Sequence, residues 1–391
     1  MLDNIKNTDN AYVASTYARF DLTLTHGKGS LVYDESGKEY IDLSTGIAVN
    51  TFGVADDKWI AAIAEQAAKI QHASNLYYTE PCARLAKMLC ERTGAGSVFF
   101  SNSGAEANEC AIKCARLYAE NTKGKDHYNV ITLKNSFHGR TVTTLAATGQ
   151  DVFHEHFTPM TEGFLYAEAN DLDEVKRLAT QNKCAAIMME AVQGEGGVLP
   201  LSQDFVKGVC DFAKENGLLV IFDEVQTGNG RTGTLYAYEQ FGVNPDIVST
   251  AKGLAGGLPI GATMFFGKAN GTLTAGLHGS TFGGNPVSCA AAISVIERID
   301  DALLADVKAK SEYIFRELSG AEGIKSVSGL GLMIGIETVA DASAVIKRCM
   351  EEGILPIKAK NKVRLLPALN IPMPLLERAI GIIKKVAKEL M

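Results

Sequence analysis

The chain contains 391 residues, of which 46% are hydrophobic and 21% charged, and its net charge at pH 7 is -7. This composition is that of an ordinary globular protein long enough for two domains, and it excludes disorder on a large scale. The acidic balance, with no basic block anywhere, excludes the electrostatic attraction on which nucleic-acid binding depends, so we expect no nucleic-acid partner.

The start of the chain, from Met1 to Lys6, lacks the apolar core of a signal peptide. Because no stretch of about eighteen apolar residues appears anywhere, we expect no membrane span and a cytoplasmic location. Residues 31–42 then alternate between apolar and polar side chains on either side of Ser36 and Gly37. This alternation predicts a β-hairpin whose turn lies at those two residues.

Short apolar runs alternate with helical patterns through the middle of the chain, which is typical of a mostly parallel sheet with helices on both faces. The predicted strands are 97–100, 129–133, 184–189, 218–222, 247–250 and 262–266. Helix and strand signals return after about residue 300, around 328–333 and 362–367. We therefore predict an α/β fold with a large domain over 56–295, and a smaller α/β domain built jointly from the chain ends, 1–55 and 296–391.

Two charged residues stand at the ends of two predicted strands. Lys252 follows the run 247–250 and Asp223 follows the run 218–222, and open α/β sheets bind ligands at the carboxyl ends of their strands. A lysine amine forms a Schiff base with the aldehyde of pyridoxal phosphate, and a carboxylate keeps the pyridine nitrogen of that cofactor protonated. Most such pairs are ordinary surface charges, so this hypothesis depends on the neighbouring segments.

A phosphate site is indicated by the segment from Ser101 to Gly104. It follows a short predicted strand and opens an amphipathic helix that begins near Ala105, so free backbone N–H groups and the positive end of the helix dipole would face an anion. The same pattern is also that of an ordinary Ser or Asn helix cap. The presence of Lys252 and Asp223 favours the phosphate.

Two further patterns point to other chemistry and are disfavoured by their context. Residues 228–233 satisfy the G-x-G-x-x-G pattern, but 223–227 separate them from the strand and no apolar helix follows, which argues against a nicotinamide-dependent oxidoreductase. Cys110 and Cys114 lie on one apolar helical stripe, which favours core packing over metal binding. The eight cysteines form no C-x-x-C pair, so we expect reduced thiols and no metal site.

Six segments together resemble the class III (omega-amino) aminotransferases, a family of fold-type I pyridoxal phosphate enzymes. The segments are SGAEANE at 103–109, FHGRT at 137–141, QGEGG at 193–197, DEVQTG at 223–228, AKG at 251–253 and GSTFGGNP at 279–286. The resemblance spans nearly the whole chain. It implies pyridoxal 5'-phosphate as the cofactor and the transfer of an amino group as the reaction.

The resemblance also implies roles for residues around the cofactor ring. Lys252 would bind the cofactor and move the proton between the substrate carbon and the cofactor. Asp223 would bind the pyridine nitrogen. Val225 and Phe137 would pack on the two faces of the ring, and Gln226 would hydrogen-bond the ring hydroxyl oxygen.

The implied phosphate site involves two subunits. Ser103, Gly104 and Ala105 would hold the phosphate at the start of their helix, Gly104 and Ala105 through their backbone N–H groups. Thr281 would reach the phosphate of the neighbouring subunit. The resemblance therefore implies a homodimer with shared active sites.

An aminotransferase pocket accepts an omega-amine and glutamate in turn, and only glutamate carries a carboxylate on the reacting carbon. The resemblance implies that Arg364 binds this carboxylate and that Glu195 neutralises Arg364 when the amine is bound instead. Arg140, helped by Ser280, would hold the far carboxylate of either substrate. Without the resemblance, Glu195 and Arg364 are typical of solvated surface charges.

Within the family, the segments 46–50, 74–78 and 137–140 are most similar to those of the enzymes that act on acetylornithine. This similarity implies transfer of the δ-amino group of N2-acetyl-L-ornithine to 2-oxoglutarate, giving N-acetyl-L-glutamate 5-semialdehyde and L-glutamate in arginine biosynthesis. N-succinyl-diaminopimelate is a further candidate substrate. The alternatives are succinylornithine, ornithine or 4-aminobutyrate as donor, or a non-catalytic pyridoxal phosphate-binding protein, against which Lys252 argues.

The chain departs from many members of the family at three positions. Val54 stands where a His is common, Asn229 where an apolar residue is common, and Ser328 where a basic residue is common. These differences leave the proposed chemistry unchanged and bear on the choice of substrate. A substrate-facing role for Tyr12 or Tyr17 stays open.

Overall fold

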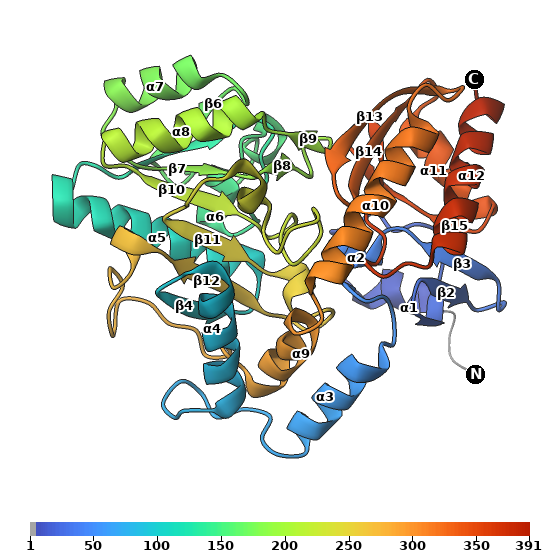
Figure 1. Ribbon diagram of the computed structural model, residues 1–391, viewed down its shortest axis with the longest axis horizontal. Coiled ribbons are helices and arrows are strands. Elements are labelled where there is room, and N and C mark those ends of the chain that lie inside the picture. Colours follow the sequence, from blue (N-terminus) through green and yellow to red (C-terminus); the bar gives the residue numbers. More distant parts are fainter. Residues whose placement is uncertain (1–4) are drawn as a thin grey trace.

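A seven-stranded sheet forms the centre of the larger part of the molecule (Figure 1). The computed structural model describes residues 5–391. In spatial order the strands are β4 (Ser97–Ser101), β12 (Gly261–Phe265), β11 (Ile247–Thr250), β10 (Leu219–Asp223), β7 (Cys184–Met189), β5 (Asn129–Leu133) and β6 (Phe164–Ala167). Only β12 runs antiparallel to its neighbours. The predicted α/β fold with a mostly parallel sheet is confirmed.

Six of these strands agree with the predicted runs to within one residue at each end. The seventh, β6, was missed. It is only four residues long, lies at the edge of the sheet, and three of its four residues are only partly buried. It therefore lacks the continuous apolar run that identifies a strand buried on both faces.

The side chains of the central strands alternate between two cores. On β10, Leu219 and Ile221 face the core beneath helix α5, whereas Val220 and Phe222 belong to the core on the other side. Helix α5 covers the first face and helices α7 and α8 cover the second, as Figure 1 shows. The helices of this part are α3 (Asp57–Ala67), α4 (Glu80–Thr93), α5 (Gly104–Lys123), α6 (Val142–Ala147), α7 (Leu172–Gln181), α8 (Gln203–Glu215) and α9 (Pro286–Ile296).

Helix α5 begins where the sequence predicts and buries the predicted stripe. The Ser103 hydroxyl oxygen accepts the backbone N–H of Glu106 and caps the helix. Cys110 and Cys114 have no exposed surface and pack against the sheet. Their prediction as core residues is confirmed, and all eight cysteines are free.

The smaller part combines both ends of the chain. One sheet has the order β1 (Leu24–Lys28), β2 (Leu31–Asp34), β3 (Glu39–Asp42) and β15 (Ile354–Leu355), and the second has the order β13 (Ile324–Leu330), β14 (Met333–Thr338), β17 (Lys362–Leu365) and β16 (Ile357–Ala359). Helices α10 (Asp301–Leu318), α11 (Ala342–Glu351) and α12 (Met373–Glu389) pack against them. Ile41 and Leu43 share one core with residues from these helices. The exact domain boundaries stay a prediction.

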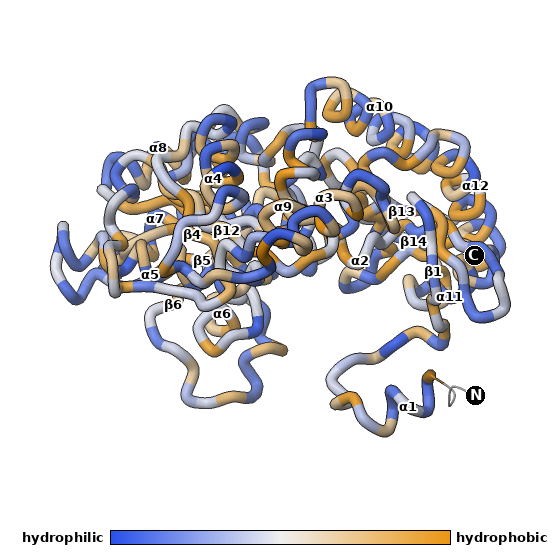
Figure 2. The backbone as a smooth tube through the Cα atoms, turned by 90° about the horizontal axis from the view of Figure 1, so that it is seen from below, coloured by the Kyte–Doolittle hydropathy of each residue, from blue (hydrophilic) through white to orange (hydrophobic). Residues whose placement is uncertain are grey.

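The predicted hairpin at 31–42 is present as the antiparallel pair β2 and β3. Before it, helix α1 (Ile5–Tyr12) lies away from the body of the molecule, as Figure 2 shows. Tyr12 and Tyr17 are both strongly exposed. A substrate-facing role for either stays a prediction.

The segment 228–233, which satisfies the G-x-G-x-x-G pattern, forms turns and opens no helix. It lies instead against the turn between β13 and β14. Arg231 donates to the Leu332 carbonyl at 3.2 Å, and its own carbonyl accepts the Leu332 N–H at 2.9 Å. The pattern therefore belongs to the junction of the two parts of the molecule and not to a dinucleotide site.

The remaining short elements are α2 (Thr45–Ala48), the paired strands β8 (Val192–Gln193) and β9 (Leu199–Pro200), and four 3-10 turns, η1 (Asp151–Phe153), η2 (Ala237–Phe241), η3 (Lys252–Leu254) and η4 (Gly267–Ala269). None of the helices within residues 5–391 combines the length and apolar character that crossing a membrane requires.

Gly331→Ala tests the junction between the two parts of the molecule, where Arg231 contacts the turn between β13 and β14. Gly331 has φ +55°, and an added Cβ would lie 2.5 Å from the Arg231 carbonyl oxygen. We expect a loss of about 3 kcal/mol in the free energy of unfolding, because overpacking adds to left-handed backbone strain. Gly320→Ala is the matched control, since Gly320 has φ +78° with nothing within 4 Å, and it should cost only about 1 kcal/mol. Equal losses in urea unfolding would show that the close contact is unimportant.

Candidate active site

A cavity of about 410 Å³ opens at the carboxyl ends of the central strands. It has the size of an ordinary small-molecule site. Nine of the predicted site residues line it: Ser103, Gly104, Ala105, Phe137, Arg140, Asp223, Val225, Gln226 and Lys252. Segments far apart in the sequence are thus brought together by the parallel sheet.

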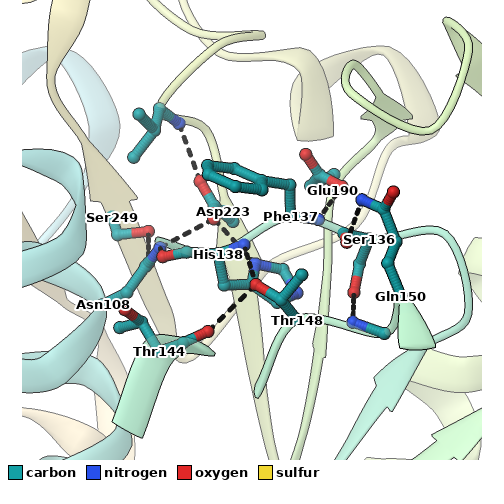
Figure 3. A network of polar contacts seen from close by, with 12 residues as sticks. Asn108, Ser136, Phe137, His138, Thr144, Thr148, Gln150, Glu190, Asp223 and Ser249 are labelled. Carbon is teal, nitrogen blue, oxygen red and sulfur yellow. Dashed lines mark hydrogen bonds and ion pairs between the residues drawn. The ribbon is translucent and has the colours of Figure 1, made fainter. Parts of the chain in front are cut away.

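The Asp223 carboxylate lies at the floor of this cavity in a network of hydrogen bonds (Figure 3). Its Oδ2 accepts from Asn108 Nδ2 at 2.7 Å and from His138 Nδ1 at 2.8 Å, and its Oδ1 accepts the Val225 backbone N–H at 3.0 Å. Asp223 is only 4% exposed. Three donors compensate the burial of the charge that a carboxylate carries.

The two side chains that hold Asp223 are themselves fixed. Ser249 donates its hydroxyl to Asn108 Oδ1, and Asn108 Nδ2 also donates to the His138 carbonyl at 2.8 Å. The His138 N–H donates to Thr148 Oγ1 at 3.0 Å. His138 Nε2 is also buried and has no hydrogen-bond partner among residues 5–391.

Lys252 lies on the wall of the same cavity, at the start of η3 and just beyond β11. Its φ of +45° is unusual for a residue with a side chain. Burial lowers the pKa of the Lys252 amine below its ordinary value, an effect that the Glu195 charge opposes and the Arg364 charge reinforces. A lowered pKa makes the neutral, nucleophilic amine more available.

The beginning of α5 forms another side of the cavity. Gly104 and Ala105 stand in the first turn, where backbone N–H groups have no partner within the helix. A Cβ on residue 104 would lie 2.6 Å from the Val225 side chain, so Gly104 allows the helix start and Val225 to approach closely. The helix end can therefore present its N–H groups to an anion in the cavity.

Arg364 and Glu195 form an ion pair beside the cavity. The Arg364 guanidinium, 2% exposed, contacts Glu195 Oε1 at 2.7 Å and Gln226 Oε1 at 3.0 Å. Arg364 comes from β17 of the smaller part, so both parts of the chain build this region. Burial acts to raise the pKa of Glu195, but the charges of Arg364 and Lys252 and the hydrogen bonds from Arg364 and Gln226 together hold that pKa below its ordinary value.

Arg140 is exposed and makes no ion pair among the described residues 5–391. Its guanidinium lies over the rings of Phe137 and Phe153, 5.8 and 4.9 Å from their centroids. These two rings place a free positive charge at the cavity mouth without neutralising it. Phe153 was missed in the sequence because nothing local links it to the motif at 137–141.

Ser280 and Thr281 lie outside the cofactor cavity of their own chain. They line a separate hollow of about 790 Å³ together with residues 74–79. Ser280 Oγ accepts from Asn102 Nδ2 at 3.1 Å, so it is one hydrogen bond away from the cavity. The predicted help of Ser280 to Arg140 and of Thr281 to a neighbouring phosphate both stay predictions.

The cavity fits pyridoxal phosphate in three respects. A lysine amine is available on the wall, an ionised carboxylate stands at the floor, and helix N–H groups with no charged partner stand at one side. These are the groups that an aldehyde, a pyridinium nitrogen and a phosphate require. No cluster of three or more potential metal ligands occurs within residues 5–391.

The model of the aminotransferase class-III family matches residues 12–387. The acetylornithine aminotransferase of Haemophilus ducreyi is 50% identical over 99% of both chains, and that of Methanocaldococcus jannaschii is 42% identical over 99% of both. Among solved structures, an ornithine aminotransferase from Toxoplasma gondii with pyridoxal phosphate at its active site has a TM-score of 0.93 at 30% identity, covering 98% of this chain and 94% of its own. The N-acetylornithine aminotransferase of Stenotrophomonas maltophilia has a TM-score of 0.84 at 32% identity, covering 97% of each chain.

The family match covers nearly the whole chain, and the relatives align with it from end to end. It agrees with the lysine, the buried carboxylate and the helix start in one cavity. The chain belongs to the class III aminotransferase family of pyridoxal phosphate-dependent enzymes.

Proposed function

We propose that the protein transfers the δ-amino group of N2-acetyl-L-ornithine to 2-oxoglutarate, giving N-acetyl-L-glutamate 5-semialdehyde and L-glutamate. The names of full-length relatives at 40–50% identity support the donor. The observation that carries the two-substrate reaction is the Arg364–Glu195 pair at 2.7 Å beside Lys252. This reaction belongs to arginine biosynthesis, and the free cysteines favour a cytoplasmic location.

Lys252 and Asp223 would hold the cofactor. When bound, pyridoxal phosphate accepts the amino group and withdraws electrons from the carbon that carried it. The Asp223 carboxylate, held in place by Asn108 and His138, would bind the protonated ring nitrogen. Lys252 Nζ, with its lowered pKa, would take the proton from the substrate carbon and deliver it to the cofactor carbon that received the amino group.

The remaining cofactor contacts follow the predicted roles. Phe137 and Val225 flank the space for the ring. Gln226 reaches it from the side of Arg364. Its amide oxygen accepts from Arg364 and one amide N–H donates to Glu195 Oε1 at 3.4 Å, so the second amide N–H would donate to the ring hydroxyl oxygen. Ser103, Gly104 and Ala105 supply the helix N–H groups and the cap for the phosphate.

Substrate binding depends on two arginines with opposite surroundings. Arg140 is free of acidic partners and binds the carboxylate that both substrates carry far from the reacting carbon. Arg364 is neutralised by Glu195 while acetylornithine is bound. When glutamate or 2-oxoglutarate enters, its α-carboxylate replaces Glu195 as the partner of Arg364.

A homodimer with shared active sites is part of the proposal. Leu76, Tyr77 and Tyr78 are 85%, 73% and 105% exposed in the single chain and line the same hollow as Thr281. Exposed apolar side chains grouped in this way mark a protein contact. A second copy seated there would cover them and bring Thr281 near its partner's phosphate.

One prediction of the proposed function concerns the amino donor. In the purified holoenzyme without 2-oxoglutarate, N2-acetylornithine should bleach the visible band of lysine-bound cofactor at lower concentration than succinylornithine, ornithine or 4-aminobutyrate, and 2-oxoglutarate should restore it. A stronger response to another amine would replace the donor and keep the family. Lys252→Ala should lack the band and turnover, whereas Lys268→Ala, at the opposite end of the sheet, should keep both.

The second prediction concerns the charge pair. Glu195→Gln should lower kcat/KM for acetylornithine about tenfold or more, because the Arg364 charge is then uncompensated, and should affect the reaction with glutamate much less. Since the pKa of Glu195 is lowered, the effect should not change between pH 6 and pH 9. Glu168→Gln, which removes an exposed pair with Lys134, is the control. Equal losses for both substrates would contradict the exchange of partners.

The third prediction concerns assembly. Sedimentation should give at least twice the chain mass of 41.8 kDa. Tyr78→Glu should weaken the association and lower cofactor affinity in parallel, because the site takes Thr281 from the second subunit. Val339→Glu, at an exposed apolar residue in the smaller part, should change neither. A monomeric wild type with full activity would exclude shared sites.

A further inference from the structure

Glu190 is a second carboxylic acid at the floor of the cofactor cavity. It immediately follows β7, as Asp223 ends β10, and these parallel strands pair Met189 with Phe222. Glu190 and Asp223 therefore stand side by side at the ends of adjacent strands, whose backbones are about 4.8 Å apart across the sheet. No motif in the sequence assigns a role to Glu190.

The alternation of the strands sends both acids to the same face. On β7, Ala186 and Met188 face the core beneath α5, as Leu219 and Ile221 do on β10. Glu190 and Asp223 continue these two rows. Both line the cavity, and Figure 3 shows them on the two sides of Phe137.

The two acids have unequal surroundings. Asp223 accepts three hydrogen bonds, whereas Glu190 has a single donor among residues 5–391, the Phe137 backbone N–H at 3.2 Å. Glu190 is only 5% exposed. A buried carboxylate with one donor beside another negative charge is unfavourable.

The charges that face Glu190 do not remove this penalty. Burial raises the pKa of Glu190 well above its ordinary value, and the Asp223 charge raises it further. The Phe137 N–H and the Lys252 amine act in the opposite direction, and the Glu195 charge adds to the increase. Arg364 is already paired with Glu195 at 2.7 Å.

We propose that Glu190 is a positioning residue that stays protonated and uncharged beside the ionised Asp223, so that the floor of the cavity carries one negative charge and one neutral O–H donor. This proposal deepens the proposed function and rests on it, since the single charge on Asp223 is the partner of the ring nitrogen. A second charge at this level would compete with Asp223 for that proton. Two acids with opposite protonation at one site are a known way of dividing roles between carboxyl groups.

Glu224 offers a matched control. It is also fully buried, but it faces away from the cavity and accepts hydrogen bonds from Tyr238 N–H and Thr227. Burial raises the pKa of Glu224 to about 7. At pH 9 Glu224 is therefore ionised and does not contribute a protonated-acid signal.

The test is infrared spectroscopy of the resting holoenzyme at pH 9. A protonated acid has a C=O stretching band that a carboxylate lacks. The wild type should show this band, Glu190→Gln should lose it, and Glu224→Gln should keep it. Wild-type protein labelled with 13C-glutamate should shift the same band, which keeps the test decisive if Glu190→Gln is poorly produced. A band that is absent from the wild type, or unchanged in Glu190→Gln, would overturn the proposal.

Urea unfolding at several pH values gives an independent readout. Because Glu190 takes up a proton on folding above the ordinary Glu pKa, stability is lost as the pH rises toward the raised pKa. The folding constant of Glu190→Gln relative to wild type should therefore increase as the pH rises above 6. The same ratio for Glu224→Gln should level off above pH 7. A flat ratio for Glu190→Gln would overturn the proposal, and neither result depends on which amine is the substrate.

Discussion

The ionised carboxylate of Asp223 is the constraint on which the rest of this site depends. A charge buried at the end of a central strand is costly unless donors surround it, and the chain supplies them from α5, from the segment after β5 and from its own loop. The two residues that donate from side chains are fixed in turn, Asn108 by Ser249 and His138 by Thr148. The network therefore connects α5, the segment after β5 and the loop after β10 around the Asp223 carboxylate. The cofactor cavity lies directly above this carboxylate.

The substrate side of the cavity is built on a different principle. In the proposed function a substrate carboxylate replaces Glu195 as the partner of Arg364, whereas the partners of Asp223 stay in place. Arg140 rests on aromatic rings, which orient its charge and leave it free. The site thus has a fixed anion, Asp223, on the cofactor side. On the substrate side it has Arg364, whose partner would be exchanged, and Arg140, which has no acidic partner among residues 5–391. This arrangement suits a reaction in which the cofactor stays bound and two substrates bind in turn.

Much of this was predictable from sequence because the central strands are continuous apolar runs, and because Asp223 ends one of them and Lys252 closely follows another. The short edge strand β6 carries no such signal. Glu190 and Phe153 could not be assigned from sequence, since their importance comes from strand register and from contacts between distant loops. For Glu190 the register was the missing information: once β7 is aligned with β10, the acid falls beside Asp223.

The pairing of β3 with β15 has a consequence for biosynthesis. Ile41 pairs with Ile354, a residue 313 positions later in the chain. The hairpin of β2 and β3 therefore leaves the ribosome long before β15 has been synthesised. The residues of the large sheet and the Asp223 network are complete by then, and sequential synthesis favours folding in that order. The floor for the cofactor therefore forms early, and Arg364, made almost last, completes the substrate wall only when the two ends of the chain meet.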